Sequence, residues 1–235
     1  MTFGRDKAVK SEFNYELIRS KRKSLGIKIT KDAQLVVMAP KSMKLKDIEN
    51  FLDEKSDWIN KNLLKMQGIK EKRDSFSIDE NSMLLFYGKE YPLIKYDGKK
   101  AGFDGECFYI PDDIPKENIV PTVKEIYRKL AKSYLVKRTY DLAQYFGESI
   151  NSVKINSART RWGSCSSKRN INLSLYLIMA SPDAVDYCII HELCHLKHMD
   201  HSKSFWALVE KRDPDYKIHT QELKALAKKL ALENF

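Results

Sequence analysis

The chain has 235 residues, with 42 Lys and Arg against 32 Asp and Glu, and a formal charge of +10. Its 43% hydrophobic and 31% charged residues are ordinary for a soluble globular protein. No apolar run approaches the ~18 residues of a membrane-spanning helix, and the N-terminus is too charged for a signal peptide. We therefore expect a cytoplasmic protein without a membrane segment, whose basic charge forms a solvated surface or contacts nucleic acid.

The first third of the chain is predicted to contain strands followed by a helix. Apolar side chains alternate over 13–17 and 25–29, and 35–38 is a short apolar run. After these strands the apolar period becomes helical and predicts one long helix that ends at Gly68. The residues on its apolar face are Leu45, Ile48, Leu52, Ile59, Leu63 and Met66.

A hairpin is predicted next, with strands at 83–87 and 91–96. The segment 111–115 contains two prolines and two aspartates, which interrupt both the strand and the helix period. It is the predicted boundary between an N-terminal α/β region, 1–115, and a catalytic domain, 116–235.

The C-terminal region is predicted to alternate helices and strands. Ser181 followed by Pro182 is typical of a helix start, because serine caps the first turn and proline fits the first helical position. The predicted elements, in order, are a helix at about 121–146 stopped by Gly147, strands at 153–155 and 171–175, and helices at 181–195, 202–212 and 220–232.

All five histidines lie between His191 and His219, and His191, Glu192 and His195 form an H-E-x-x-H motif on the predicted helix. Four-residue spacing places both imidazoles on one helical face, one turn apart. Both can then reach one Zn²⁺ at about 2.0–2.1 Å, with the glutamate beside a metal-bound water. The helix is strongly apolar, so these side chains are expected to be buried, and a metal would supply the partners they need.

The third metal ligand is predicted to be His201. It follows His195 by six residues, a spacing typical of zincins that return a third histidine from the turn after the helix. Glycine is required at the position of His198 in the metzincin pattern, so the chain is not a standard metzincin. His219 is expected to be a surface histidine. The alternative third ligands are His198, Glu210 and Glu222.

This ligand set predicts metal-assisted hydrolysis. Zinc lowers the pKa of bound water and polarises a scissile carbonyl, and Glu192 would take the water proton and return it to the leaving amine. Tyr216 either stabilises the oxyanion or is a half-buried packing residue. The four cysteines, at 107, 165, 188 and 194, have no C-x-x-C spacing and are expected to be free thiols.

Two further segments are candidates for the substrate cleft. Residues 161–165, Arg-Trp-Gly-Ser-Cys, form either a wall of the cleft or a packing corner at a strand end. The edge of strand 171–175 could hold an extended peptide by main-chain hydrogen bonds. The candidate cleft residues are Arg161, Trp162 and Asn172. Residues 205–206, Phe-Trp, are expected in the core.

These motifs together resemble the YgjP-like metal-dependent hydrolases, bacterial relatives of the SprT-like and WLM-type zinc proteases. The resemblance rests on 161–165, 170–173, the H-E-x-x-H motif, His201-Ser202 and Phe205-Trp206, and more weakly on segments at 19–23, 57–59 and 87–91. It implies an α+β fold, with a zincin-like catalytic domain preceded by a β-rich N-terminal part with one long helix. It also implies zinc on His191, His195 and His201, with Glu192 as the base.

A zinc metallopeptidase acting on a protein or peptide is the first functional hypothesis. A metal-dependent nucleotide or phosphate-ester hydrolase, whose substrate the basic surface would favour, is the second. The third is a DNA- or partner-binding protein with a structural zinc, against which Glu192 argues because a structural site needs no base. Related SprT-like and WLM proteins act on proteins associated with DNA, and the basic charge is compatible with that.

Overall fold

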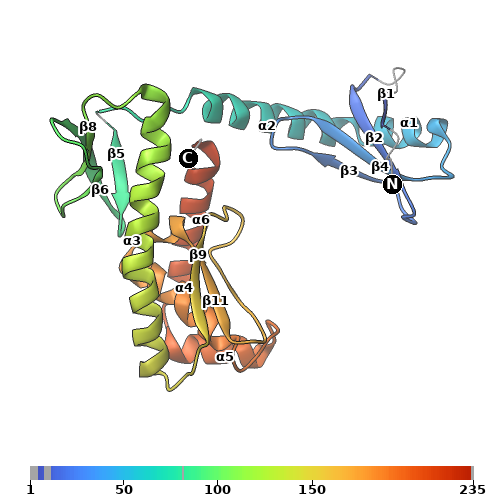
Figure 1. Ribbon diagram of the computed structural model, residues 1–235. Coiled ribbons are helices and arrows are strands. Elements are labelled where there is room, and N and C mark those ends of the chain that lie inside the picture. Colours follow the sequence, from blue (N-terminus) through green and yellow to red (C-terminus); the bar gives the residue numbers. More distant parts are fainter. Residues whose placement is uncertain (1–4, 8–11, 81, 234–235) are drawn as a thin grey trace. The chain divides into compact units, whose positions relative to one another are not determined.

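The computed structural model describes residues 5–7, 12–80 and 82–233. This part of the chain is a mixed α+β protein with three small sheets and six α-helices (Figure 1). Its contacts divide it into two compact units, one built mainly from residues up to Phe76 and the other from Ser77 to Ala231. None of the described helices combines the length and the apolar character needed to cross a bilayer.

The first unit contains a four-stranded sheet in the order β1-β2-β4-β3. Its strands are β1 (Arg5–Lys7), β2 (Tyr15–Ser20), β3 (Gly26–Ile29) and β4 (Leu35–Pro40). β2 and β4 are parallel, while the other neighbours are antiparallel. Alternate side chains of β2 and β4 are buried against two helices, which confirms the three strands predicted in this region.

The single long helix predicted for this unit is wrong, because two helices are present, α1 (Leu45–Glu54) and α2 (Ser56–Ser75). Lys55 separates them, with a φ of −103° and a ψ of 9° that depart from helical values. The predicted stop at Gly68 is wrong as well. A glycine inside a helix costs only about 1 kcal/mol relative to alanine, and the good helix formers around Gly68 carry α2 through it.

The second unit begins with a four-stranded sheet in the order β5-β6-β8-β7. Its strands are β5 (Met83–Phe86), β6 (Lys89–Tyr96), β7 (Gly102–Phe103) and β8 (Phe108–Pro111). Tyr87 and Gly88 alone connect β5 to β6, both with positive φ, as a two-residue hairpin turn requires. The predicted hairpin is therefore present with a shorter turn than expected.

A 30-residue helix, α3 (Lys116–Tyr145), follows this sheet and starts five residues before the predicted Pro121. The sheet packs on α3: the Tyr127 hydroxyl donates a hydrogen bond of 2.7 Å to the Leu85 carbonyl, and the Phe108 ring lies 5.3 Å from the Tyr127 ring. Because of this packing, the boundary predicted near residue 115 lies inside the second unit, and the division between units falls at Phe76.

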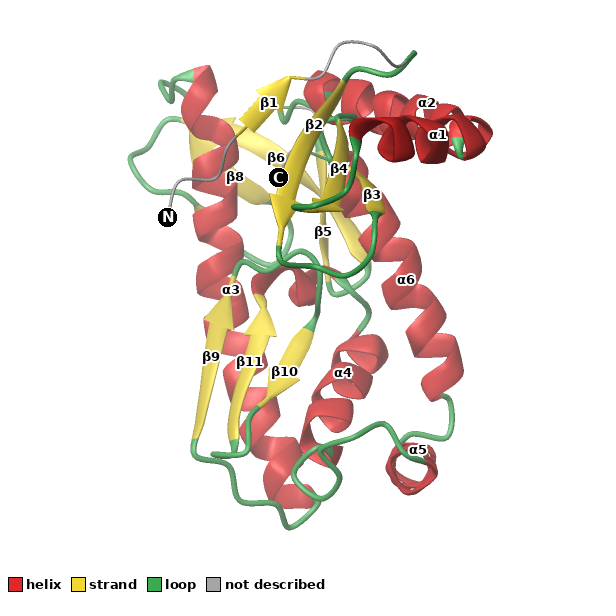
Figure 2. Ribbon diagram, turned by 90° about the vertical axis from the view of Figure 1, so that its right-hand side faces the viewer, coloured by secondary structure: helices red, strands yellow, loops and turns green. Residues whose placement is uncertain are grey.

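The third sheet contains β9 (Ser152–Asn156), β10 (Gly163–Cys165) and β11 (Asn170–Ser174) in the order β10-β11-β9. In Figure 2 it lies in front of α3, and its strand β10 contacts α4 (Pro182–Cys194). Ile171 and Leu173 of β11 are fully buried. The expectation that β11 offers a free edge is wrong, because β10 pairs with one of its sides and β9 with the other. The outer strands of this sheet are β10 and β9, each paired on one side only.

Three helices complete the second unit after the 3₁₀ segment η1 (Leu175–Met179): α4, α5 (Lys203–Arg212) and α6 (Tyr216–Leu232). Ser181 caps α4 as predicted, its hydroxyl accepting the Ala184 N–H at 3.2 Å. Glu222 of α6 in turn accepts hydrogen bonds of 2.7 Å from the Ser181 N–H and hydroxyl. The helix carrying the H-E-x-x-H motif is therefore held at its start by α6.

Candidate metal centre and active site

Three histidines converge at the C-terminal end of α4. His191 lies in the last turn of α4, His195 is its C-cap residue, and His201 lies just before α5. Their ligand atoms lie within 4.8 Å of one another, and the Nε2 atoms of His191 and His201 are 3.2 Å apart. Two nitrogens on one tetrahedral zinc are about 3.3 Å apart at ordinary bond lengths. The three histidines could therefore hold one metal ion, as predicted.

Hydrogen bonding and burial prepare these rings for a metal. Nδ1 of His195 is 2.9 Å from the His198 carbonyl oxygen, which orients the ring and leaves Nε2 available. Burial, with a smaller effect of His195 and His201, lowers the pKa of His191 to about 4, so this imidazole stays neutral. Burial also lowers the pKa of His195. Neutral imidazole is the form that binds metals.

The alternative third ligands lie elsewhere. His198 contributes its carbonyl to His195, while the Glu222 carboxylate caps α4 through Ser181. Glu210 is exposed, with Lys217 at 4.0 Å. His219, expected at the surface, is half-buried, and its Nδ1 lies 2.8 Å from Oδ2 of the buried Asp213.

The aromatic ring of Phe205 packs against all three histidines. Phe205 is fully buried, and its ring centroid lies 4.5 Å from His195 in a stacked arrangement, 4.9 Å from His191 and 4.8 Å from His201. The predicted core position of Phe205 is confirmed. Trp206 is only half-buried and lies 5.8 Å from His191. The three imidazoles therefore rest on an apolar base, which restricts their orientations.

The motif glutamate is enclosed beside the histidines. Glu192 is 5% exposed, and its Oε2 has no hydrogen-bond partner among the protein atoms. Burial raises the pKa of Glu192 to about 8, although the nearby Arg161 and the Cys165 backbone N–H, which donates to the carboxylate, both favour the charged form. One carboxylate oxygen thus remains free to accept a proton in a site largely closed to solvent.

Gly163 of β10 gives this carboxylate its space. A Cβ atom at position 163 would lie 2.6 Å from Oε1 of Glu192 and 2.7 Å from its Cγ, distances that real Cβ atoms do not show. The motif at 161–165 was predicted as cleft wall or packing corner, and the structure places it directly against the motif glutamate. Sequence reasoning missed the specific need for glycine here.

The three candidate cleft residues are placed differently from one another. Arg161 is exposed, and its positive charge favours the ionised form of Glu192, which lowers the Glu192 pKa. Trp162 is half-buried, and its carbonyl accepts the Ser174 N–H at 2.8 Å. Asn172 lies on the opposite face of the sheet, because Gly163 pairs with Leu173 and side chains alternate along a strand. The structure therefore does not bring Asn172 to the Glu192 side.

Tyr216 begins α6 and belongs to an aromatic stack next to the histidines. Its ring lies 5.5 Å from Trp206, nearly parallel to it, and 6.5 Å from Tyr187. Tyr187 is 6.1 Å from His191 and precedes it by one helical turn. The half-buried packing position foreseen for Tyr216 is present, close to the histidine cluster.

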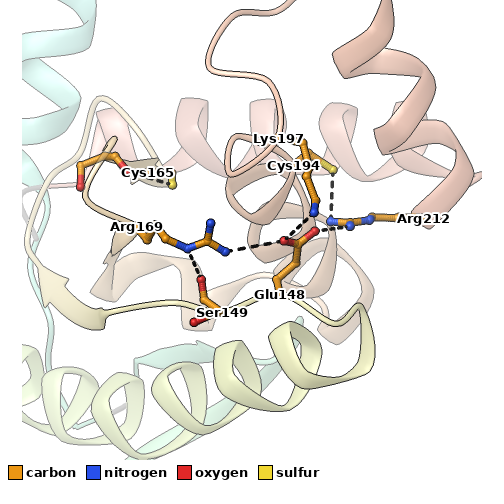
Figure 3. Close-up of polar contacts among 8 residues, drawn as sticks. Glu148, Ser149, Cys165, Arg169, Cys194, Lys197 and Arg212 are labelled. Atoms are coloured by element: carbon orange, nitrogen blue, oxygen red, sulfur yellow. Dashed lines mark hydrogen bonds and ion pairs between the residues drawn. The ribbon is translucent and has the colours of Figure 1, made fainter.

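The structure contains a buried ionic cluster around Glu148 that the sequence did not predict (Figure 3). Glu148, 7% exposed, receives a hydrogen bond of 2.6 Å from Arg212, with Lys197 at 3.6 Å and Arg169 at 3.9 Å. Arg212 also points an N–H at Cys194 inside the motif, at 3.9 Å. Arg169, Lys197 and Arg212 follow Glu148 by 21, 49 and 64 residues, so only the fold brings them to this carboxylate.

Comparison with known proteins gives the family. The family model described as the YgjP-like metallopeptidase domain matches residues 23–226. No curated protein matches the chain. Among solved structures, the metallopeptidase zymogen abylysin of Pyrococcus abyssi is similar at 24% identity, over 43% of this chain and 99% of that one, with a TM-score of 0.36. The family model spans both units and includes all three histidines, and on that match the chain belongs to the YgjP-like metallopeptidase family.

Proposed function

We propose that the protein is a zinc metallopeptidase that hydrolyses a protein or peptide substrate. The observation that carries the proposal is the convergence of His191, His195 and His201 beside the enclosed carboxylate of Glu192. Three imidazoles favour zinc over harder metals such as magnesium or calcium. A bound zinc would polarise the scissile carbonyl and acidify a water molecule.

Glu192 is the proposed general base. Its Oε2 lacks a protein partner and can accept the proton of the attacking water. The same carboxylic acid then returns that proton to the leaving amine nitrogen. A site that served only to stabilise the fold would have no use for a carboxyl group held free in this way, which argues against the structural-zinc alternative.

The free edge of β10 is the proposed docking strand for substrate, in place of β11. Only one side of β10 is paired, and Gly163 at its start touches Glu192. An extended peptide that adds to this edge by main-chain hydrogen bonds would lie next to the proposed base. Arg161 and Trp162 immediately precede the strand and remain proposed cleft residues.

Tyr216 remains the proposed oxyanion-stabilising residue. It stacks on Trp206, whose ring lies 5.9 Å from that of His201, so the Tyr216 ring is one aromatic residue away from the histidine cluster. A phenol hydroxyl can donate a hydrogen bond to the negative oxygen that forms during attack.

The first unit is the part of the chain that we propose binds an acidic partner such as nucleic acid. Residues 1–76 contain 18 Lys and Arg against 11 Asp and Glu, so they hold +7 of the net +10. β2 and β4 run parallel and end side by side at Ser20 and Pro40, which gathers the lysines that follow each strand. Four of these lysines are exposed and form no ion pair with another described residue: Lys21, Lys23, Lys41 and Lys44.

Metal analysis and turnover together test the proposed activity. Purified wild type is expected to hold about one zinc per chain and His201→Ala to lose most of it, because two imidazoles leave the site incomplete. Glu192→Gln should keep the zinc and lose peptide hydrolysis. Wild type that binds no metal would overturn the proposal. Hydrolysis of nucleoside triphosphates instead of peptides, abolished by the same variant, would establish the phosphate-ester alternative.

A further inference from the structure

The Glu148 carboxylate is almost completely enclosed, with 1% of the side chain exposed, and the proposed reaction does not use it. Three cations surround it (Figure 3): Arg212 at 2.6 Å, Lys197 at 3.6 Å and Arg169 at 3.9 Å. A buried charge is unfavourable unless it is paired; of the three cations only Arg212 is within hydrogen-bond distance, at Oε1, while Lys197 and Arg169 face Oε2 from farther away. The position of Glu148 therefore matters to every segment that it contacts.

The backbone of Glu148 is itself immobilised by the end of α3. Gly147 has a φ of 66°, its N–H donates to the Gln144 carbonyl at 3.1 Å, and the Glu148 N–H donates to the Ala143 carbonyl at 2.7 Å. This is the Schellman arrangement that ends many helices. The carboxylate is thus attached to a fixed point of the longest helix in the unit.

Of the two principal partners of Glu148, Lys197 lies between two metal ligands in sequence and Arg212 lies after the last of them. Lys197 follows His195 by two residues. Arg212 ends α5, the helix whose Phe205 ring packs against all three imidazoles. Arg212 also lies over the Phe146 ring at 4.6 Å and contacts Cys194, the neighbour of His195. One carboxylate therefore connects α3 with the residues on both sides of His201.

We infer that Glu148 is a positioning residue of the metal centre. Through Lys197 and Arg212 it fixes the segment from His195 to α5, so that His195 and His201 keep the spacing that one metal ion needs. The inference rests on the proposed function in one respect, namely that the three histidines bind metal. Outer partners that orient metal ligands typically change metal affinity by about 10–100-fold when they are removed.

A metal titration of full-length protein tests this role. Metal-free wild type and Glu148→Gln are titrated with Zn²⁺ against a chromophoric chelator, and Co²⁺ complexes are compared by visible absorption. Glutamine keeps the volume and one acceptor but removes the charge. We expect a zinc Kd weaker by roughly 10–100-fold and altered Co²⁺ bands, because the ligand geometry is no longer held.

Asp186→Asn is the matched control. It removes the ion pair of Asp186 with Arg138, which also joins α3 to α4 but lies before the ligand-bearing turn. We expect this variant to lose thermal stability and to keep the wild-type zinc Kd and Co²⁺ spectrum. Equal losses of affinity in both variants would show a general effect of destabilisation and would overturn the inference.

The remaining outcomes separate the inference from the proposed function. An unchanged zinc Kd in Glu148→Gln, with wild type binding normally, overturns the role of Glu148 and leaves the metallopeptidase proposal standing. Wild type that binds no zinc overturns both. If Glu148→Gln does not fold, Lys197→Met replaces it, since Lys197 is 56% exposed. A several-fold weaker Kd is then expected, and an unchanged Kd contradicts the inference.

Discussion

Gly163 of β10 lies so close to Glu192 of α4 that a side chain at position 163 would require Glu192 to move. We expect Gly163→Ala to displace the Glu192 carboxylate, because the added methyl group would lie 2.6 Å from Oε1. Peptide hydrolysis should fall by about 100-fold or more, since small misplacements of a catalytic group have effects of this size.

Zinc content distinguishes this effect from general damage to the site. Gly163→Ala should retain about one zinc per chain, because the atoms nearest to the added Cβ belong to Glu192 and not to a histidine. Gly105→Ala is a suitable control for glycine replacement, since nothing lies within 4 Å of its added Cβ, although its φ of 109° will cost some stability. Wild-type kcat in Gly163→Ala would show that Glu192 tolerates displacement.

Glu192 should make the metal-free protein less stable as the pH rises. Its pKa is about 8 in the folded chain, against roughly 4.3 in an unfolded one. Between these values the folded state binds more protons than the unfolded state, so the free energy of unfolding decreases with pH, by at most about 1.4 kcal/mol per unit, and levels off above pH 8.

The window from pH 6.5 to 8 isolates this effect. Below pH 6.5 the lowered pKa of His191 makes the free energy of unfolding increase with pH, because His191 binds a proton in the unfolded state but not in the folded state. Urea unfolding of metal-free wild type and Glu192→Gln at pH 6.5 and 8 measures the difference. Wild type should lose up to about 2 kcal/mol relative to the variant over this interval. Parallel profiles would mean that Glu192 is already ionised at pH 6.5.

Tyr216→Phe tests the proposed oxyanion role. If the hydroxyl stabilises the developing negative charge, kcat should fall by roughly 100-fold or more while KM and zinc content change little. Tyr187→Phe is the matched control, because it removes a hydroxyl from the same aromatic stack. A kcat close to wild type in Tyr216→Phe would leave packing against Trp206 as the function of Tyr216.

The basic residues after β2 and β4 should determine any binding to nucleic acid. Changing Lys21, Lys23, Lys41 and Lys44 together to glutamine should weaken binding of a fluorescent DNA duplex by roughly tenfold or more and reduce its salt dependence. Four exposed lysines of the second unit, Lys116, Lys132, Lys224 and Lys228, form a control with the same charge change. Equal losses in both variants would show that net charge alone is responsible.

The metal site could be predicted from sequence because its ligands are close together in the chain. His191 and His195 share a helical face by spacing alone, and His201 is only six residues further on. The capped start of α4 at Ser181 follows from local chemistry in the same way. Such features depend on backbone geometry within a few residues, which the sequence specifies directly.

Features that depend on pairing over long distances could not be predicted. Whether β11 is an edge strand depends on its pairing with β9 and β10, and the residues of β11 themselves do not indicate this pairing. Glu148 meets Arg212 across 64 residues, and a single glutamate gives no indication of being buried. The face that Asn172 occupies could not be predicted for the same reason, since it depends on strand register.

The short length of the proposed docking strand, β10, also limits self-association. An exposed strand edge can recruit another copy of the same protein, and natural proteins limit this by keeping such edges very short. β10 has only three residues, and the turn that follows it contains Arg169 with a φ of 60°, so the extended backbone ends abruptly. This edge is long enough to align a few residues of a peptide and too short to template a growing sheet.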